Sequence, residues 1–223
     1  MIKIVGVAHV LNLKSKIYAI INYEMPDAIA IELDQYRLDA LINKSPQGRK
    51  ISIFNILGRI QKQIASTQNV FPGEEMLAAY EKGQMINRPV FLIDLDINTT
   101  YKKFKEEVRL IEKIKIIFSI LFSIAPRRSK MISIDDVLRN ENEYLEKFRK
   151  SYSTFVKILL DDREDYMAKK ILELEKFGKV IAFVGDGHIQ GLKKRIPQAE
   201  TITLQRFLEM EIPNNEFSLS IKI

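Results

Sequence analysis

The stretch Lys179-Val180-Ile181-Ala182-Phe183-Val184-Gly185-Asp186-Gly187-His188 indicates the fold of this chain. Five apolar residues run without a break and then give way to a glycine, an acid, a second glycine and a histidine. An unbroken apolar run bounded by glycine predicts a strand buried on both faces of a sheet. The chain has only two histidines, and the other repeats the arrangement, because Ile2-Lys3-Ile4-Val5 leads into Gly6-Val7-Ala8-His9. Each histidine therefore follows a predicted strand, three residues after a glycine.

Two more apolar runs, Ala28–Ile31 and Val90–Ile93, end at the acids Glu32 and Asp94. A further strand is predicted at residues 201–204, and the alternating tail after Pro213 resembles an edge strand. Segments of helical periodicity separate these runs. The predicted helices cover residues 13–23, 34–42, 51–65, 74–86, about 99–124 and about 133–177, with a short one after residue 188. Asp34 and the run Asn98-Thr99-Thr100 are predicted helix caps.

Strands that alternate with helices predict an α/β fold with a mostly parallel central sheet and helices on both faces. The exception is an all-helical insertion, residues about 99–150, before the last parallel strands. We expect a single domain spanning residues 1–223. Length and composition agree, because 223 residues with 46% hydrophobic and 29% charged residues suit a globular protein.

The absence of cysteine excludes disulfides, thiolate catalysis and cysteine-held metal centres. The formal charge of +6 is most simply a mixed charged surface with a modest lysine excess, and no nucleic-acid partner is expected. Ile116–Ala125 is the longest apolar stretch and has basic flanks. It is shorter than the roughly 20 residues that span a bilayer. We expect it to be buried in a core or a homodimer interface, with peripheral contact to a membrane surface as the alternative. Residues 1–12 show a strand pattern rather than a signal peptide, so we expect a cytoplasmic protein.

Four polar residues follow the predicted parallel strands: His9, Glu32, Asp94 and His188. Ligands of open parallel sheets bind beyond the carboxyl ends of the strands, where these residues would meet. Imidazoles and carboxylates are the ligands of Zn, Mn, Co and Fe sites. Two histidines and one carboxylate holding a metal, with another carboxylate as base, would suit hydrolysis by an activated water. The nearby glycines would let the backbone turn tightly and approach a ligand.

Each of these residues also has a structural explanation. A histidine is often simply hydrogen-bonded in a core. Acids could each simply favour the N-terminus of a helix, as is possible for Glu32, Asp94 or Asp96, Glu74 and Glu75. The run Asp162-Arg163-Glu164-Asp165-Tyr166 has the default interpretation of a solvated, salt-bridged helix face. Gly185, Gly187 and Gly191 miss the spacing of a dinucleotide-binding loop by one residue.

In order along the chain, these motifs resemble the TraB/PrgY family, which is related to the Tiki metalloproteases and more distantly to erythromycin-esterase and ChaN-like proteins. The resemblance runs from Gly6 to about Gly191. It is carried by Gly6-Val7-Ala8-His9-Val10, Pro26-Asp27, Ile31-Glu32-Leu33-Asp34 with Arg37, Pro72-Gly73-Glu74-Glu75-Met76, Leu92-Ile93-Asp94, Asp96-Ile97, Asp162-Arg163-Glu164, Tyr166-Met167-Ala168 and Gly185-Asp186-Gly187-His188.

The resemblance implies a metal-dependent peptidase. Its metal ligands would be His9, His188 and Glu32, and the ion would be divalent Mn, Co, Zn or Fe. Glu75, with Glu32, would be catalytic, and Arg37 and Arg163 would hold a substrate carboxylate or an oxyanion. Leu95 stands where many relatives have arginine. One alternative is a protein that binds or sequesters a pheromone-like peptide without cleaving it, and a second is a membrane-surface or scaffold protein.

Overall fold

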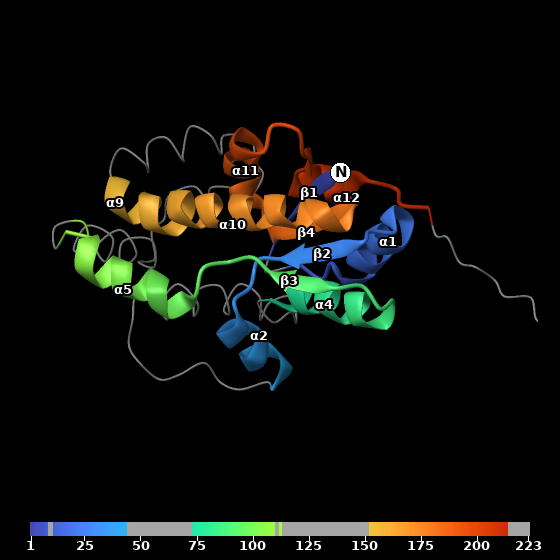
Figure 1. Ribbon diagram of the computed structural model, residues 1–223, viewed down its shortest axis with the longest axis horizontal. Coiled ribbons are helices and arrows are strands. Elements are labelled where there is room, and N and C mark those ends of the chain that lie inside the picture. The colour runs from blue at the N-terminus through green and yellow to red at the C-terminus, as the bar shows by residue number, and fades with distance from the viewer. Residues whose placement is uncertain (9–10, 44–72, 110–111, 113–151, 214–223) are drawn as a thin grey trace, which may run out of the picture. The chain divides into compact units, whose positions relative to one another are not determined.

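The computed structural model describes residues 1–8, 11–43, 73–109, 112 and 152–213 (Figure 1). Its centre is a sheet of five strands, all parallel, in the order β3-β2-β4-β1-β5. The strands are β1 (Ile2–Val7), β2 (Ala28–Ile31), β3 (Val90–Leu92), β4 (Val180–Gly185) and β5 (Glu200–Ile202). The predicted α/β fold with a parallel sheet and helices is confirmed. The last strand differs from the prediction, because it ends at Ile202 and not at Leu204.

Strand β4 occupies the middle of the sheet, as its unbroken apolar sequence predicts. It pairs with β1 from Ile2↔Val180 to Val7↔Gly185, and with β2 from Ala28↔Val180 to Ile31↔Phe183. All five apolar residues of β4 are buried. Because the strands are parallel and in this register, the carboxyl ends of β1, β2 and β4 are neighbours.

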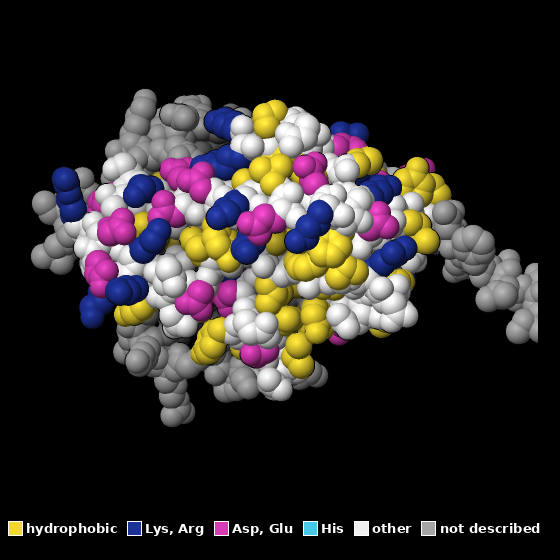
Figure 2. Space-filling view, viewed as in Figure 1, with side chains coloured by type: hydrophobic (Ala, Val, Ile, Leu, Met, Phe, Trp, Pro, Cys, Tyr) yellow, Lys and Arg dark blue, Asp and Glu magenta, His cyan; other side chains and the backbone are white. Residues whose placement is uncertain are grey.

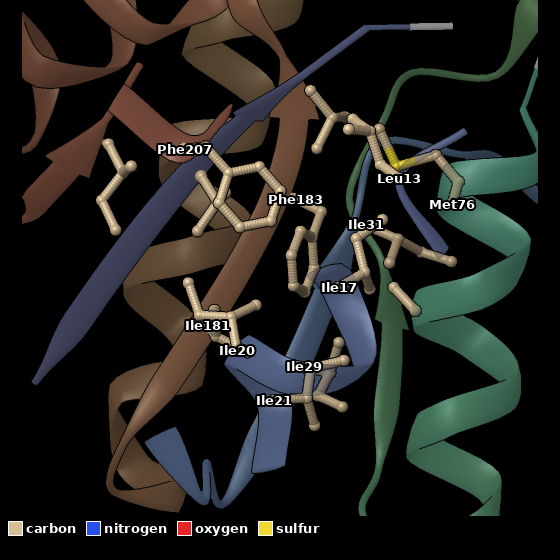
Figure 3. Close-up of a cluster of buried hydrophobic side chains, with 14 of the residues drawn as sticks. Leu13, Ile17, Ile20, Ile21, Ile29, Ile31, Met76, Ile181, Phe183 and Phe207 are labelled. Carbon is tan, nitrogen blue, oxygen red and sulfur yellow. The ribbon is translucent and has the colours of Figure 1, made fainter. Parts of the chain in front are cut away.

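Successive residues of the strands supply two separate cores, one on each face of the sheet. On one face lie Ile29, Ile31, Ile181 and Phe183, together with Val5 and Val7. Helices α1 (Lys14–Glu24), α4 (Glu74–Met85) and α12 (Leu204–Glu209) cover that face. In Figure 3, Phe183 lies among Ile17, Ile31 and Phe207. Each fully buried side chain of this kind contributes about 1.5–3 kcal/mol.

The other face of the sheet packs against α10 (Asp162–Glu173) and α11 (Ile189–Arg195). Met167 and Ile171 of α10 and Leu192 of α11 are completely buried there. Small strand residues, Ala30 and Ala182, leave room for these helices. The helices on both faces fix the carboxyl edge of the sheet, where the loops carry the polar residues.

Local signals explain most helix ends. Asp34 caps α2 (Gln35–Ile42) as predicted, because its side chain accepts a hydrogen bond from the N–H of Arg37. Gly178, with φ of 108°, ends the 3₁₀ turn Leu174–Phe177 before β4. The predicted cap Asn98-Thr99-Thr100 is wrong, since α5 (Ile97–Glu107) begins before it and the N–H of Ile97 donates to Asp34 Oδ2 (3.0 Å). The helix also ends at Glu107, well before residue 124.

The chain divides into two compact units, Met1–Ile97 with Glu164–Ile223, and Asn98–Arg163. The first contains the sheet. The second includes α9 (Ser153–Val156), whose Phe155 packs edge-on against Phe104 of α5 with ring centres 5.8 Å apart. A π-helical turn, Lys157–Asp161, joins α9 to α10. The predicted insertion, residues 99–150, falls within the second unit.

Several predicted segments lie outside the described residues: 51–65, 116–125, 133–149 and 217–223. The proposed core, dimer or membrane role of Ile116–Ala125 therefore stays a prediction. None of the described helices is both long and apolar enough to cross a bilayer. Acidic and basic side chains are interspersed over the described surface that Figure 2 shows.

Candidate functional site

His188 lies between two carboxylates at the carboxyl edge of the sheet. The chain leaves β4 through a single 3₁₀ turn, Asp186–His188, and His188 is only 5% exposed. Its Nε2 is 3.4 Å from Oε1 of Glu32, and its Nδ1 is 3.3 Å from Oε1 of Glu164. The two ring nitrogens thus face two different carboxylates. The structure brings together His188 and Glu32, which the parallel topology predicts to meet.

Glu32 is held in place by the neighbouring strand. It follows β2 directly, is buried, and accepts a hydrogen bond at Oε2 from the N–H of Gly185 (2.6 Å). Its own N–H donates to the carbonyl of Phe183 (3.0 Å). It does not cap α2, because Asp34 does. Its other oxygen, Oε1, is the one that faces His188.

Glu164 is the residue of this cluster that sequence reasoning missed. It is 1% exposed, so the interpretation of residues 162–166 as a solvated face is wrong for Glu164. Its Oε2 accepts a hydrogen bond from Nη1 of Arg195 (2.7 Å), and Arg195 Nε also donates to the exposed Asp165 (2.6 Å). Glu164, Met167, Ala168 and Ile171 are the buried residues of α10. That i, i+3, i+4, i+7 spacing was the available signal, because it puts an acid on the apolar stripe of the helix.

Two glycines make room for carboxylates. A Cβ built on Gly191 would lie 1.9 Å from Oε2 of Glu164, and one on Gly6 would lie 2.1 Å from Oδ1 of Asp186. That oxygen of Asp186 accepts the N–H of Leu204 (2.6 Å), and burial raises the pKa of the carboxyl in spite of this hydrogen bond. A tight turn does follow Gly185, the 3₁₀ turn Asp186–His188, but it needs no positive φ. Among the described glycines, only Gly73 and Gly178 have positive φ.

Arg37 joins the ends of β2 and β3. Its Nε donates to Asp34 Oδ2 (2.9 Å), and its Nη2 pairs with Oδ2 of Asp94. Asp94 is buried, and its Oδ1 accepts the N–H of Leu95 (2.8 Å). Asp94 and Arg37 therefore form an ion pair here, beside the Asp34 cap.

Glu75 lies in the first turn of α4 and is 1% exposed. The direction of α4 follows from Gly83, whose built Cβ would lie 2.3 Å from Val90 Cγ2 and 3.2 Å from Ile29 Cδ1, at the starts of β3 and β2. From Gly83 back to Glu75 the helix rises about 12 Å. From Ile29 to Glu32 the strand rises about 10 Å. Glu75 therefore lies toward the carboxyl edge of the sheet, as does Glu32.

Comparison with known proteins agrees with these motifs. A sequence model of the TraB/PrgY/gumN family matches residues 2–202, which include all five strands, Glu32, Glu164 and His188. The chain belongs to the TraB/PrgY/gumN family. The resemblance drawn from the sequence motifs is thereby confirmed. This TraB-family chain is also 29% identical over 218 residues to an uncharacterized protein of Methanocaldococcus jannaschii. That alignment covers 89% of this chain and 54% of the relative, so the chain spans about half the length of that relative.

Two predicted site residues of the TraB-family chain cannot be related to His188 by geometry. His9 lies outside the described residues, although its strand is described and Val7 pairs with Gly185. Arg163 belongs to the second unit, where its Nη1 donates to the carbonyl of Leu159 (3.2 Å). Among the residues that the structure describes, no group of three or more His, Asp or Glu side chains is arranged to hold a metal. The roles of His9, Arg163 and the metal remain predictions.

Proposed function

We propose that the carboxyl edge of the sheet binds one divalent metal ion and that the protein is a metal-dependent hydrolase acting on peptides. The observation that carries the proposal is the position of His188 between Glu32 and Glu164. Arg195 pairs with Oε2 of Glu164, and the other oxygen of Glu164 can accept a hydrogen bond from an N–H at Nδ1 of His188. In that arrangement a neutral His188 would direct the lone pair of Nε2 toward the side of Glu32.

A metal ion bound there would accept lone pairs from Nε2 of His188 and from the carboxylate of Glu32. The donor set fits such an ion. A neutral imidazole whose other nitrogen bonds a carboxylate is the usual form of a metal-bound histidine. His9 would add a third ligand, because β1 is paired with β4. Imidazole and carboxylate ligands suit Mn, Co, Zn and Fe.

An ion held there would polarise a carbonyl oxygen and lower the pKa of a water. The remaining roles fall to this chain's own residues. Glu75, in the first turn of α4, would orient the attacking water and take its proton. Arg37 or Arg163 would hold a substrate carboxylate or the developing oxyanion. Peptides as the substrate class rest on the resemblance to the Tiki metalloproteases.

Metal content, measured by elemental analysis of protein purified without chelator, tests the proposal. The wild type is compared with the variant that carries both His9→Ala and His188→Ala, and with Glu200→Gln as a control at the opposite edge of the sheet. We expect one metal per chain in the wild type and in the control, and none in the double variant. A circular dichroism spectrum checks that the double variant folds. No metal in the wild type, even after incubation with Mn, Zn, Co and Fe(II), would overturn the proposal.

A second candidate function is peptide binding without cleavage. It is favoured by the engagement of Arg37 with Asp34 and Asp94, because these acids offset the positive charge that a substrate carboxylate or an oxyanion would need. The two candidates are separated by incubating metal-loaded protein with a peptide mixture. Products detected by mass spectrometry support hydrolysis, whereas bound but intact peptide supports sequestration.

A further inference from the structure

We propose that Asp186 is a positioning residue, which fixes the turn that carries His188 against the end of β1 by filling a hollow at Gly6. Gly6 begins the first Gly-x-x-His motif, and Asp186 lies within the second. One contact therefore joins the two segments that carry the histidines of this chain. The inference deepens the proposed function, on which it rests for its purpose, because both histidines are proposed ligands of one metal. Asp186 would act through His188 and would touch neither metal nor substrate.

Three elements line the hollow at Gly6. Gly6 pairs with Val184 near the end of β4, and a Cβ built on it would lie 2.1 Å from Oδ1 of Asp186. That Cβ would also lie 3.0 Å from Cγ1 of Ile189, on α11, and 3.1 Å from the backbone N of Leu204, on α12. Real Cβ atoms essentially never come within 3.0 Å of another heavy atom outside their own chain neighbourhood. Glycine is therefore the residue that lets the carboxylate of Asp186 stay in this place.

The oxygen of Asp186 that fills the hollow is also held by α12. Oδ1 accepts a hydrogen bond from the N–H of Leu204 (2.6 Å). Leu204 is the first residue of α12, and the first N–H groups of a helix have no partner within that helix. The carboxylate cannot leave the hollow without giving up this hydrogen bond. Because Asp186 opens the three-residue turn that ends at His188, a side chain fixed at its start restricts where the turn can place the imidazole.

A merely structural role for Asp186 would be to stabilise α12. Thr203→Ala is the matched control for that role, because Thr203 caps the same helix by accepting the N–H of Arg206 at Oγ1 (3.3 Å). Thr203 is not among the atoms nearest to the hollow at Gly6. If Asp186 acted only through α12, Thr203→Ala would have the same effects on His188 as Asp186→Ala.

The contact between Gly6 and Asp186 is tested by urea unfolding of four metal-free proteins: wild type, Gly6→Ala, Asp186→Ala and the double variant. We expect Gly6→Ala to lower the urea midpoint more in the wild-type background than in the Asp186→Ala background, since the nearest clashing atom is then absent. If Gly6→Ala alone does not fold, recovery of folding in the double variant gives the same answer. Equal losses in the two backgrounds would overturn the inference.

The positioning of His188 is tested by ¹H–¹³C NMR of the imidazole rings in metal-free protein at one fixed pH. The chain has two histidines, and His9→Gln assigns their signals. We expect a changed His188 signal in Asp186→Ala, and a signal like that of the wild type in Thr203→Ala and in Asp186→Asn. Asn removes the charge but keeps an oxygen that can accept the N–H of Leu204, so it separates position from charge. An unchanged signal in Asp186→Ala, or the same change in either of the other two variants, would overturn the inference.

Titration of the same proteins with Zn²⁺ separates this inference from the proposed function. Loss of a group that orients a metal ligand lowers metal affinity about 10- to 100-fold. We expect that loss for Asp186→Ala, and no loss for Asp186→Asn or Thr203→Ala. If the wild type binds no metal but the His188 signal responds as expected, the proposed function fails and the positioning role stands. If the wild type binds metal and Asp186→Ala binds it equally well, the positioning role fails alone.

Discussion

The sheet has an amino edge, where its parallel strands begin, and a carboxyl edge, where they end. Both edges bury charged side chains, but they combine the charges differently. At the amino edge, Lys3 pairs with Glu24 and with Glu200 (3.1 Å), and Lys179 pairs with Glu24 (2.6 Å). Both of these acids pair with a lysine. At the carboxyl edge, His188 stands between Glu32 and Glu164, and Arg195 pairs with Glu164.

The pKa shifts at the amino edge show that the buried charges there compensate one another. Burial alone would raise the pKa of Glu24, but hydrogen bonds and charges from Lys179 and Lys3 lower it below its ordinary value. Burial alone would lower the pKa of Lys3, but Glu24 and Glu200 raise it. Folding thus favours both ionised forms. At the carboxyl edge, by contrast, Nε2 of His188 lies 3.4 Å from Oε1 of Glu32, where we propose that a metal binds. The amino edge therefore stabilises the fold, whereas the proposed metal site lies at the carboxyl edge.

The largest effect on stability is expected for Glu24→Ala. Removing one partner of a buried ion pair costs about 3–5 kcal/mol, because the remaining charge stays buried. We expect about 3 kcal/mol, since Lys3 keeps Glu200. Urea unfolding measures the loss, and metal affinity should not change. A loss below about 1 kcal/mol would mean that this pair contributes no more than an ordinary surface salt bridge. The amino edge would then not be a stabilising feature of the fold.

Glu32→Gln should have the opposite effects from Glu24→Ala, with little change in stability and a large loss of metal affinity. The amide oxygen can still accept the N–H of Gly185, so we expect unfolding free energy to change by less than about 1 kcal/mol. Metal affinity, measured by calorimetric titration, should fall about 100-fold, which corresponds to about 2.7 kcal/mol. If the variant instead loses as much stability as Glu24→Ala and keeps its metal affinity, Glu32 is a structural acid and the two edges are alike.

Sequence alone predicted the part of the site that depends on strand topology. The apolar runs placed β2 and β4, and the parallel rule then brought Glu32 and His188 to one edge. Asp34 was also predictable, because a cap acts within three residues of itself. The second hydrogen bond of Asp34 was not predictable, because its donor, the N–H of Ile97, is 63 residues away in the sequence. Helix α5 begins at Ile97, before the predicted cap.

The missed residues depend on which surfaces meet in the folded chain. Glu164 looks like part of a charged helix until α10 is known to bury the face that carries Met167 and Ile171. Lys3 and Glu200 are far apart in sequence and meet because β1 pairs with β5. Helix α12 was not predicted, because Leu204 continues the apolar pattern of β5. The signal for its start was Thr203, which caps the helix.

The smallest effect is expected from acid, and its sign follows from Glu24. Its pKa is lowered in the folded protein, so its stabilising contribution is present above the unfolded value and is lost as the pH falls through the folded value. Protonation should cost less than Glu24→Ala does, because the protonated side chain keeps its volume and can still hydrogen-bond. The variant for this test is Glu24→Gln, which cannot titrate at this position. We expect metal-free wild type to lose more unfolding free energy on acidification than Glu24→Gln does, in urea unfolding at successive pH values. If the curves of unfolding free energy against pH run parallel for the two proteins, the ionised form of Glu24 is no better stabilised in the fold than in the unfolded chain. The assignment of the amino edge as the stabilising edge would then be wrong.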